Sequence, residues 1–332
     1  MARVLVTVLA SGLAMALVSG AAPRAADSSV GDAASATTGR LALWRSLLVR
    51  PPGSDAGVVS GPSPARAALG ALLFADPRLS GPGDRSCASC HVPDRGFTDG
   101  LPRARGRAGP LARNTPTLWN VGDARRLNWD GGERDLAHHA RRPIENREEM
   151  AGSLAIAAGR LAADAAMRER FAAAFPAAPT VAPGDIPVAL AAYLGTLASP
   201  QTRFDRWAAG DDNALTGVEQ EGLLLFVGRA RCATCHAGWR FTDDRLHDIG
   251  RPAAAGRLVE VKTPTLRELR ATAPYMHDGT LATLEAVVHH YSEGVVTRGT
   301  LSPNIARGLR LSDREIAALV AFLATLSSTP ER

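Results

Sequence analysis

Cys87-Ala88-Ser89-Cys90-His91 and Cys232-Ala233-Thr234-Cys235-His236 are two copies of a Cys-x-x-Cys-His pentapeptide, and together they contain all four cysteines of the 332-residue chain. Two thiols spaced for one helical turn can add to the two vinyl groups of a haem, and the histidine that follows can bind the iron. A structural disulfide, a thioredoxin-like redox pair and half of a zinc site are the alternatives for each pair. None of them explains a histidine after both pairs. The sequence therefore predicts two covalently bound c-type haems, with His91 and His236 as iron ligands.

The N-terminus has the pattern of a secretory signal. Arg3 supplies a positive start, residues 4–18 form an apolar run, and Ser19-Gly20-Ala21 fits a cleavage site between small residues. The run is short for a membrane span, so we expect cleavage and no membrane span in the mature protein. Covalent haem attachment takes place outside the cytoplasm, which agrees with export. We therefore expect a periplasmic protein.

The charge of the chain gives no indication of a nucleic-acid partner. The formal charge is +5, and two propionates on each haem would bring the holoprotein close to neutrality. The sequence contains no cluster of lysine and arginine of the kind that follows a phosphate backbone. We therefore expect no nucleic acid among the partners.

Periodicity and capping residues predict an all-α chain with two cytochrome c-like haem domains. Thr216 with Glu219 and Ser312 with Glu315 form capping boxes, each followed by an apolar run. We expect helices near residues 41–49, 64–74, 152–175, 185–198, 216–227 and 312–326. A helix before the haem motif and a helix at the end of the domain match the crossed-helix plan of cytochrome c. Residues 200–212 are polar and turn-rich, which indicates a domain boundary, so we expect haem domains over 62–205 and 206–332. Before them we expect a signal peptide over 1–26 and a flexible segment over 27–61.

The rest of the chain resembles one known family from about residue 68 to residue 326. It is similar to the bacterial dihaem cytochrome c peroxidases and their MauG relatives. The similar segments are Arg113-Asn114-Thr115-Pro116-Thr117-Leu118-Trp119-Asn120, Asn128-Trp129-Asp130-Gly131, Pro143-Ile144, Glu149-Met150, Phe204-Asp205-Arg206-Trp207, Thr263-Pro264-Thr265-Leu266-Arg267 and Ala273-Pro274-Tyr275-Met276-His277-Asp278-Gly279. The resemblance implies that the N-terminal haem meets peroxide and that the C-terminal haem relays electrons.

The resemblance also implies roles in the N-terminal haem pocket. In ordinary peroxidases of the family a histidine blocks this haem from the loop that precedes Arg113, but residues 98–112 contain no histidine. We therefore expect an accessible haem. His139 falls where relatives have a distal glutamine, so it would be a hydrogen-bonding group, an iron ligand or a structural residue. Glu149 resembles the distal carboxylate that moves a proton, and Pro143 would cover the same face.

The C-terminal haem departs from the ordinary peroxidases at its second ligand. Tyr291 stands where they carry a methionine. In this respect the chain resembles the MauG relatives, in which a tyrosine is the axial ligand. A phenolate is a hard donor that stabilises oxidised iron, which lowers the reduction potential relative to a thioether. Met276 and His290 are the alternatives to Tyr291. Trp129 resembles the tryptophan between the two haems of the family, and a purely structural core aromatic is the alternative.

Two further groups of residues follow from the resemblance. Asn114 with the backbone carbonyls of Thr272 and Pro274 resembles the inter-domain calcium site of the family, and oxygen ligands suit this cation. His247 and His277 would lie near the C-terminal haem. One departure is Gly132, where relatives commonly have an arginine that would contact a haem edge or propionate.

Three functions remain open at this point. The first is a MauG-like oxidase that uses hydrogen peroxide to oxidise a partner protein, which the resemblance implies to be a methylamine dehydrogenase precursor in tryptophan tryptophylquinone biogenesis. The second is a cytochrome c peroxidase that reduces peroxide to water with electrons from a small cytochrome c or cupredoxin. The third is a dihaem electron-transfer protein without catalysis, which would need strong ligands on both faces of both irons.

Overall fold

The computed structural model describes residues 39–54, 63–252 and 259–328. The predicted signal peptide and most of the predicted segment 27–61 lie outside the described residues. Residues 39–48 are helical, as the sequence indicates for 41–49, and Leu48 is fully buried. Arg50 donates hydrogen bonds to the carbonyl and hydroxyl oxygens of Ser199, each 2.8 Å long. Leu48 and Arg50 are therefore packed within the compact unit that begins at Ala42.

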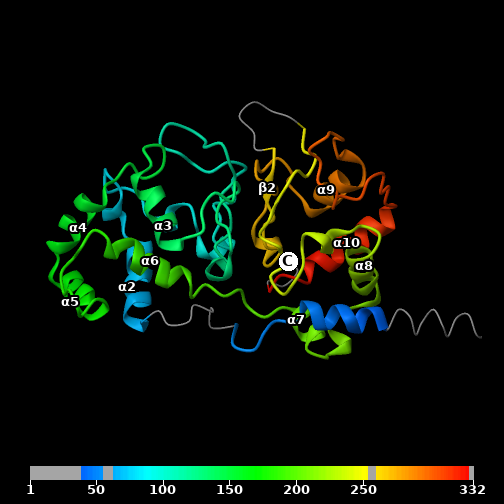
Figure 1. Cartoon of the computed structure of the whole chain (residues 1–332), viewed down its shortest axis with the longest axis horizontal. Helices are drawn as coiled ribbons and strands as arrows, with labels where there is room; N and C mark the ends of the chain where they lie inside the picture. The colour runs from blue at the N-terminus through cyan, green and yellow to red at the C-terminus, as the bar shows by residue number, and fades with distance from the viewer. Residues whose placement is uncertain (1–38, 55–62, 253–258, 329–332) are drawn as a thin grey trace, which may run out of the picture. The chain divides into compact units, whose positions relative to one another are not determined.

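The same pair of crossed helices occurs twice along the chain (Figure 1). In the N-terminal half α2 (Pro64–Phe74) packs on α6 (Asp185–Leu194), and in the C-terminal half α8 (Gly217–Val227) packs on α10 (Asp313–Ala324). Proline at the first position starts α2, because its missing N–H would be unpaired there in any case. The predicted capping boxes start α8 and α10. These four helices agree with the sequence predictions, apart from α6 ending at Leu194 instead of near residue 198.

A glycine at each crossing lets the two helices touch. A Cβ atom on Gly70 would lie 2.0 Å from the carbonyl oxygen of Ala189, and one on Gly222 would lie 2.0 Å from that of Ala318. No side chain fits at such a distance from a backbone atom. The crossings of the two halves therefore share one geometric requirement as well as one arrangement.

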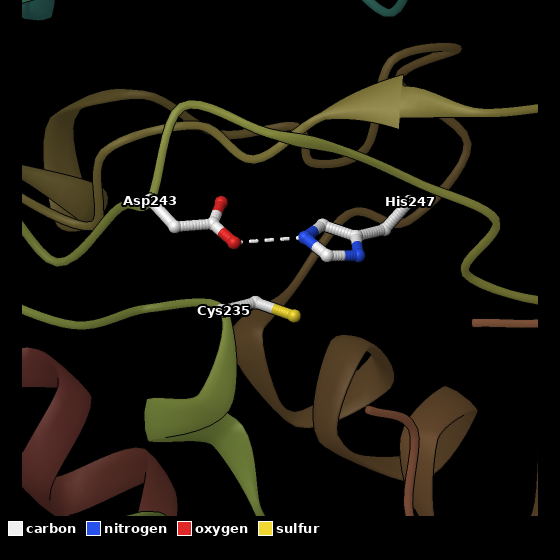
Figure 2. A group of neighbouring side chains, drawn as sticks. All are labelled: Cys235, Asp243 and His247. Carbon is white, nitrogen blue, oxygen red and sulfur yellow. Dashed lines mark hydrogen bonds and ion pairs between the residues drawn. The ribbon is translucent and has the colours of Figure 1, made fainter. Parts of the chain in front are cut away.

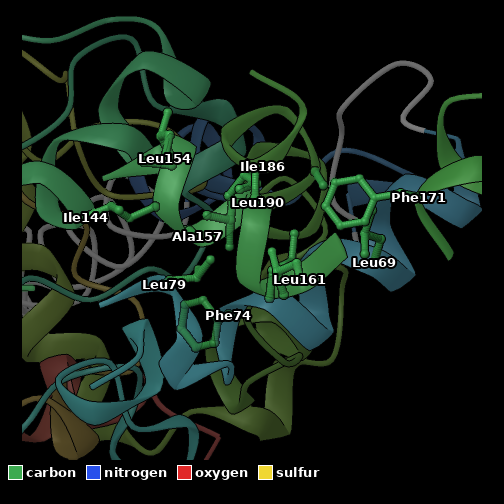
Figure 3. Packing of buried hydrophobic residues seen from close by; sticks show 14 of the residues in the cluster. Leu69, Phe74, Leu79, Ile144, Leu154, Ala157, Leu161, Phe171, Ile186 and Leu190 are labelled. Carbon is green, nitrogen blue, oxygen red and sulfur yellow. The ribbon is translucent and has the colours of Figure 1, made fainter. Parts of the chain in front are cut away.

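Aromatic rings fill the space beside each crossing in equivalent ways. Phe74 lies edge-on to Phe97 and Tyr193, with ring centroids 6.2 and 5.3 Å apart. In the C-terminal half Phe226 packs on Phe241 at 6.0 Å and on Phe322 at 5.1 Å. The N-terminal core continues away from the crossing through apolar residues of α4, α5 and α6, with Leu161, Phe171 and Ile186 fully buried (Figure 3).

Several elements differ from the sequence predictions. The single helix expected over 152–175 is two helices, α4 (Leu154–Ala162) and α5 (Ala165–Ala174), because the Asp164 side chain accepts from the backbone N–H groups of Ala166 and Met167 and starts a new helix. The sequence analysis missed α3 (Leu136–Glu145), which contains Pro143 in its interior.

The predicted domain boundary between residues 205 and 206 falls inside a helix. Residues 203–208 of the expected turn-rich stretch form α7 (Arg203–Ala208), which begins with a capping box of Thr202 and Asp205. Phe204 is fully buried, with ring centroids 5.2 Å from Phe241 and 5.8 Å from Phe322. α7 therefore packs with the C-terminal core, and the boundary at 205/206 would cut an element of that core.

The remaining elements are short. α9 (Leu284–His289) continues directly into the π-helix η9 (His290–Gly294). The two-residue strands β1 (Leu246–His247) and β2 (Val261–Lys262) pair antiparallel. The 3₁₀ turns are η2 (Pro77–Leu79), η3 (Cys87–Ser89), η4 (Pro93–Arg95), η5 (Val121–Asp123), η6 (Asp212–Ala214), η7 (Cys232–Thr234) and η8 (Leu269–Ala271). The described chain is thus mostly helical, as predicted. None of its described helices has the length and apolar character needed to cross a membrane.

We predict that Gly222→Ala lowers the free energy of unfolding by about 1–3 kcal/mol, because the new methyl group cannot avoid the Ala318 carbonyl without moving α10. Gly159→Ala is the matched control, since Gly159 lies in α4 with no atom within 4 Å of its would-be Cβ. That substitution should raise stability by about 0.5–1 kcal/mol. Thermal unfolding of the holoprotein measures both, and equal effects would contradict the crossing argument.

Candidate functional site

Both Cys-x-x-Cys-His motifs open onto one cavity of about 720 Å³. Cys87, Cys90, Cys232 and Cys235 line this cavity as free thiols, together with His91 and His236. In each motif the two cysteines lie in or next to a 3₁₀ turn, η3 and η7, so that both thiols reach the same side. The structure therefore brings together all six residues that the sequence assigns to haem attachment.

The two motif histidines are oriented in the same way. Nδ1 of His91 lies 2.9 Å from the carbonyl oxygen of Phe97, and Nδ1 of His236 lies 2.8 Å from that of Phe241. A carbonyl can only accept, so Nδ1 must carry the proton and the lone pair is left on Nε2. Burial lowers the pKa of both imidazoles, that of His236 to about 4, which keeps them neutral. Neutral histidine with its other nitrogen bonded to a carbonyl is the usual form of an iron ligand, so both sites fit a c-type haem.

α3 and the residues after it supply one wall of the cavity beside the first motif. His139, Pro143 and Glu149 all line it. The side-chain amide of Asn146 donates to Glu149 Oε1 at 2.6 Å, while burial raises the pKa of the Glu149 carboxyl. A carboxyl group that holds a proton more tightly than usual and faces a cavity is suited to general acid–base chemistry there.

His139 has an unusual environment for a buried histidine. Its Nδ1 is buried and has no hydrogen-bond partner among the described residues. Burial, followed by the positive charge of Arg142, lowers the pKa of His139 to about 4. The side chain is therefore neutral at neutral pH. Both a hydrogen-bonding role toward a bound molecule and iron ligation remain open for it.

The loop over residues 98–112 approaches the same cavity without a histidine. Its lining residues are Thr98, Ala104, Arg105, Leu111 and Ala112.

Tyr291 lies in the π-helix η9 and lines the cavity beside the second motif. Burial is the main cause that raises the pKa of its hydroxyl, and the thiols of Cys232 and Cys235 contribute through their proximity. A π-helical turn shifts the side chains after it around the helix axis, and such turns are frequent at functional sites.

The two alternatives to Tyr291 differ in position. His290 is buried, its Nε2 lies 3.0 Å from the carbonyl oxygen of Ile249, and it is not among the cavity-lining residues. The Ile249 carbonyl occupies this nitrogen and His290 does not line the cavity, so His290 is not placed to bind iron. Met276 does line the cavity.

Trp129 connects the two halves of the described chain. Its indole Nε1 donates to the Asn114 carbonyl at 2.9 Å, and its own carbonyl accepts from the backbone N–H of Lys262 at 2.7 Å. The ring lies edge-on to His277, with centroids 6.4 Å apart. Trp129, His277 and Lys262 all line the cavity. These contacts hold Trp129 between Asn114, in the N-terminal half, and Lys262, in the C-terminal half.

The oxygen atoms expected to bind calcium lie in the same region. Asn114, Thr272 and Pro274 line the cavity, and the Asn114 backbone N–H donates to the His277 carbonyl at 3.0 Å. The Asn114 side-chain N–H donates to the Leu101 carbonyl at 2.8 Å, which leaves the amide oxygen as a possible donor atom. The donor set is all oxygen and fits a hard cation.

Cys235, Asp243 and His247 form a compact cluster beside the second motif (Figure 2). Their donor atoms lie within 4.8 Å of one another, which is close enough to hold a metal ion. His247 Nε2 lies 2.8 Å from Asp243 Oδ2, and Nδ1 lies 3.1 Å from the Ser302 hydroxyl. Because Cys235 belongs to the haem motif, the cluster fits a haem-wall group better than a zinc site. The structure places His247 beside the second motif, as expected.

The sequence analysis missed Lys262, which is the only lysine in the sequence. Its ammonium group lies 3.9 Å from Asp244 Oδ1 and is mostly buried, and burial lowers its pKa. The sequence does hold a signal for this residue, because a single lysine among 38 basic residues is an outlier.

Comparison with known proteins gives a consistent result. Residues 64–213 match the model of the family described as di-haem cytochrome c peroxidase. The chain is 39% identical to methylamine utilization protein MauG of Methylorubrum extorquens, over 96% of this chain and 91% of that protein. It is 36% identical to cytochrome c551 peroxidase of Nitrosomonas europaea, over 79% of each chain. The crystal structure of a MauG-like protein associated with microbial copper homeostasis superposes with a TM-score of 0.75 at 30% identity, covering 84% of this chain and 92% of that one.

We predict that the purified protein carries two covalently bound haems and that Cys232→Ala with Cys235→Ala reduces the number to one. The matched control is Cys87→Ala with Cys90→Ala, which should retain the haem of the second motif. Intact mass and the pyridine haemochrome spectrum count the haems. Two covalent haems in either double variant would exclude that pair as an attachment site.

Proposed function

The chain belongs to the dihaem cytochrome c peroxidase and MauG family, and from that premise we propose that it is a MauG-like oxidase that uses hydrogen peroxide to oxidise a partner protein. Members of this family are haem oxidoreductases that act with peroxide. The observation that carries the MauG-like proposal is the position of Tyr291 in the cavity wall beside the second motif. The loop over residues 98–112, which has no histidine to cover the first haem, supports it.

Each half would hold one haem as a cytochrome c-like domain. Cys87, Cys90 and His91 would hold the first, and Cys232, Cys235 and His236 the second; when bound, these haems supply the iron at which peroxide is reduced and the oxidising equivalents are kept. The repeated helix crossing and the matching Nδ1 contacts of the two histidines support this assignment. An oxygen-bound calcium ion at Asn114, Thr272 and Pro274 would complete the cofactors.

Glu149 would move the proton in the first pocket. Reduction of hydrogen peroxide to two water molecules consumes two electrons and two protons, and one proton must pass from one peroxide oxygen to the other. The Glu149 carboxyl faces the cavity with a raised pKa, so it can take this proton and return it. His139 would hold the peroxide by a hydrogen bond, and Pro143 would limit the space on the same face.

Trp129 and Tyr291 would act in the transfer of the two electrons that hydrogen peroxide takes up. The indole of Trp129 is fixed between the two halves, where it would carry charge from one haem to the other. The phenolate of Tyr291 would favour the oxidised state of the second iron, since it is an anionic oxygen donor. Both electrons are finally replaced by the partner protein, which is oxidised.

The partner we propose is a methylamine dehydrogenase precursor in which two tryptophans mature to tryptophan tryptophylquinone. Support comes from the name of the relatives at 39% and 38% identity, methylamine utilization protein MauG. Export to the periplasm, as the N-terminal sequence indicates, would bring the enzyme to such a partner.

A cytochrome c peroxidase fed by a small redox protein is the second candidate. The relatives named cytochrome c551 peroxidase, at 36% and 31% identity, favour it. A dihaem electron-transfer protein without catalysis is the third; it would need strong ligands on both irons, and binding of the first iron by His139 would support it.

We predict that one equivalent of hydrogen peroxide, added to the fully ferric protein without a reductant, promptly abolishes the ferric signals of both haems in optical and EPR spectra. Tyr291→Met should remove this response and make the reaction depend on prior reduction of the second haem, because a thioether stabilises ferrous iron. A wild-type protein that stays inert until it is reduced would instead identify an ordinary peroxidase.

We further predict that Glu149→Gln slows the reaction with peroxide by about 10²–10⁴-fold, because the amide keeps the size of the side chain but cannot transfer the proton. Glu145→Gln is the matched control, since Glu145 lies four residues earlier and pairs with Arg141 at the surface. Stopped-flow absorbance measures both rates. Equal rates for the two variants would remove Glu149 from the proton path.

A further inference from the structure

The loop that holds the iron-binding histidine is braced by the same short segment in both halves of the chain. The segments are Thr115-Pro116-Thr117-Leu118-Trp119-Asn120 and Thr263-Pro264-Thr265-Leu266-Arg267-Glu268. The hydroxyl of Thr117 donates to the Gly96 carbonyl at 2.6 Å, and that of Thr265 donates to the Arg240 carbonyl at 2.7 Å. Gly96 and Arg240 directly precede Phe97 and Phe241, whose carbonyls accept from the two histidines.

The last residue of each segment completes the correspondence. Asn120 and Glu268 both adopt the left-handed backbone conformation, with φ of 57° and 61°. Their backbone N–H groups donate to Leu197 and Leu326, which follow α6 and α10. Each side chain then accepts from the backbone N–H of a serine that lies two residues after that leucine, Ser199 in one half and Ser328 in the other. The two braces are therefore structural equivalents, residue by residue.

The equivalent residues Trp119 and Arg267 differ in charge. The Trp119 ring lies edge-on to Phe97 with centroids 4.8 Å apart, and the Arg267 guanidinium lies 5.2 Å from the centroid of Phe241. Both side chains thus pack against the phenylalanine whose backbone carbonyl accepts from the motif histidine. One half uses a neutral indole and the other a fully buried cation.

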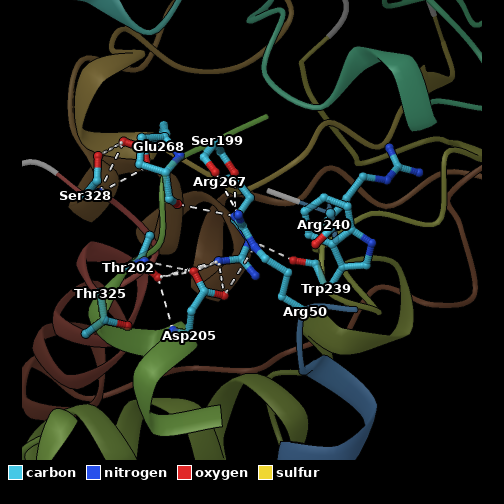
Figure 4. A network of polar contacts seen from close by, with 12 residues as sticks. Arg50, Ser199, Thr202, Asp205, Trp239, Arg240, Arg267, Glu268, Thr325 and Ser328 are labelled. Atoms are coloured by element: carbon cyan, nitrogen blue, oxygen red, sulfur yellow. Dashed lines mark hydrogen bonds and ion pairs between the residues drawn. The ribbon is translucent and has the colours of Figure 1, made fainter. Parts of the chain in front are cut away.

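Arg267 is held by direct polar contacts (Figure 4). Its Nε donates to the Trp239 carbonyl at 2.7 Å, and a terminal nitrogen donates to Asp205 at 2.8 Å. Arg50 also approaches Asp205, at 3.9 Å, and lies 5.1 Å from the centroid of the Trp239 ring. Burial lowers the pKa of Arg267 only to about 10, so it is charged at neutral pH.

We propose that Arg267 is a positioning residue for the proximal side of the second haem, and that its charge, balanced by Asp205, sets the reduction potential of this haem apart from that of the first. The proposal rests on the proposed attachment of a haem at Cys232 and Cys235. A cation in a poorly screened interior stabilises the reduced, less positive iron, and an anion does the reverse. Arg267 therefore raises the potential, and Asp205 lowers it.

The test is a spectroelectrochemical titration of both haems in three variants, with the first haem of each molecule as internal reference. Arg267→Met removes the cation and should lower the potential of the second haem only. Asp205→Asn removes the anion and should raise it. We expect each substitution to shift the reduction potential of the second haem by about 59 mV. For one electron, this shift changes the equilibrium constant for electron exchange between the two haems about tenfold.

Arg203→Met is the matched control, because Arg203 begins the same helix as Asp205 but pairs with Glu219 and is half-exposed. It should shift neither potential. A loss of packing would move the Arg267 and Asp205 variants in the same direction, whereas the charge argument requires opposite directions. If Arg267→Met does not take up its second haem, Asp205→Asn against Arg203→Met still decides the sign.

Shifts of equal sign, shifts of both haems together, or shifts no larger than that of Arg203→Met would overturn the proposal. Because the titration contains no peroxide, its outcome is independent of the proposed oxidase activity. A protein that does not react with peroxide but shows the opposite shifts would refute the proposed function and leave the role of Arg267 intact.

Discussion

The hydrogen bond from each motif histidine to a phenylalanine carbonyl is the contact on which the rest of the structure depends. It fixes the tautomer and the orientation of His91 and His236, and therefore the direction from which each would bind iron. The carbonyl can do so only if its loop is rigid. The two braces and the aromatic rings beside the helix crossings contact these loops and hold the two carbonyl oxygens in place.

Features with strong local signals could be predicted from the sequence. Proline at the start of α2 and the capping boxes of α8 and α10 determine where these helices begin, whatever packs on them, and the helices occur as expected. The sequence argument failed where tertiary contacts outweigh local preference. α3 contains Pro143 in its interior, where a proline normally indicates the end of a helix, and α7 is only six residues long, too short to show a period.

The residues of the site also differ in how far the sequence could predict them. The haem-binding residues carry a motif and were found together, whereas the roles of Tyr291, Trp129 and Glu149 came from resemblance to a family and remain proposals. Spacing alone could not show that His290 faces the Ile249 carbonyl while its neighbour faces the cavity, because that difference arises in the π-helix. Likewise, the correspondence of Trp119 and Arg267 emerges only when their contacts are compared, since the two side chains have no chemistry in common.

The burial of Lys262 has a consequence for the surface of the molecule. Every other basic side chain among the 38 is an arginine, and a guanidinium remains protonated far above the pH at which an ammonium group loses its proton. The outer positive charge of this protein therefore does not fade under alkaline conditions. A partner that docks on these arginines would meet their positive charge at alkaline as well as at neutral pH. Reagents directed at amines would leave that surface unmarked and would find in the chain only the mostly buried ammonium group between the two halves and the terminal amine.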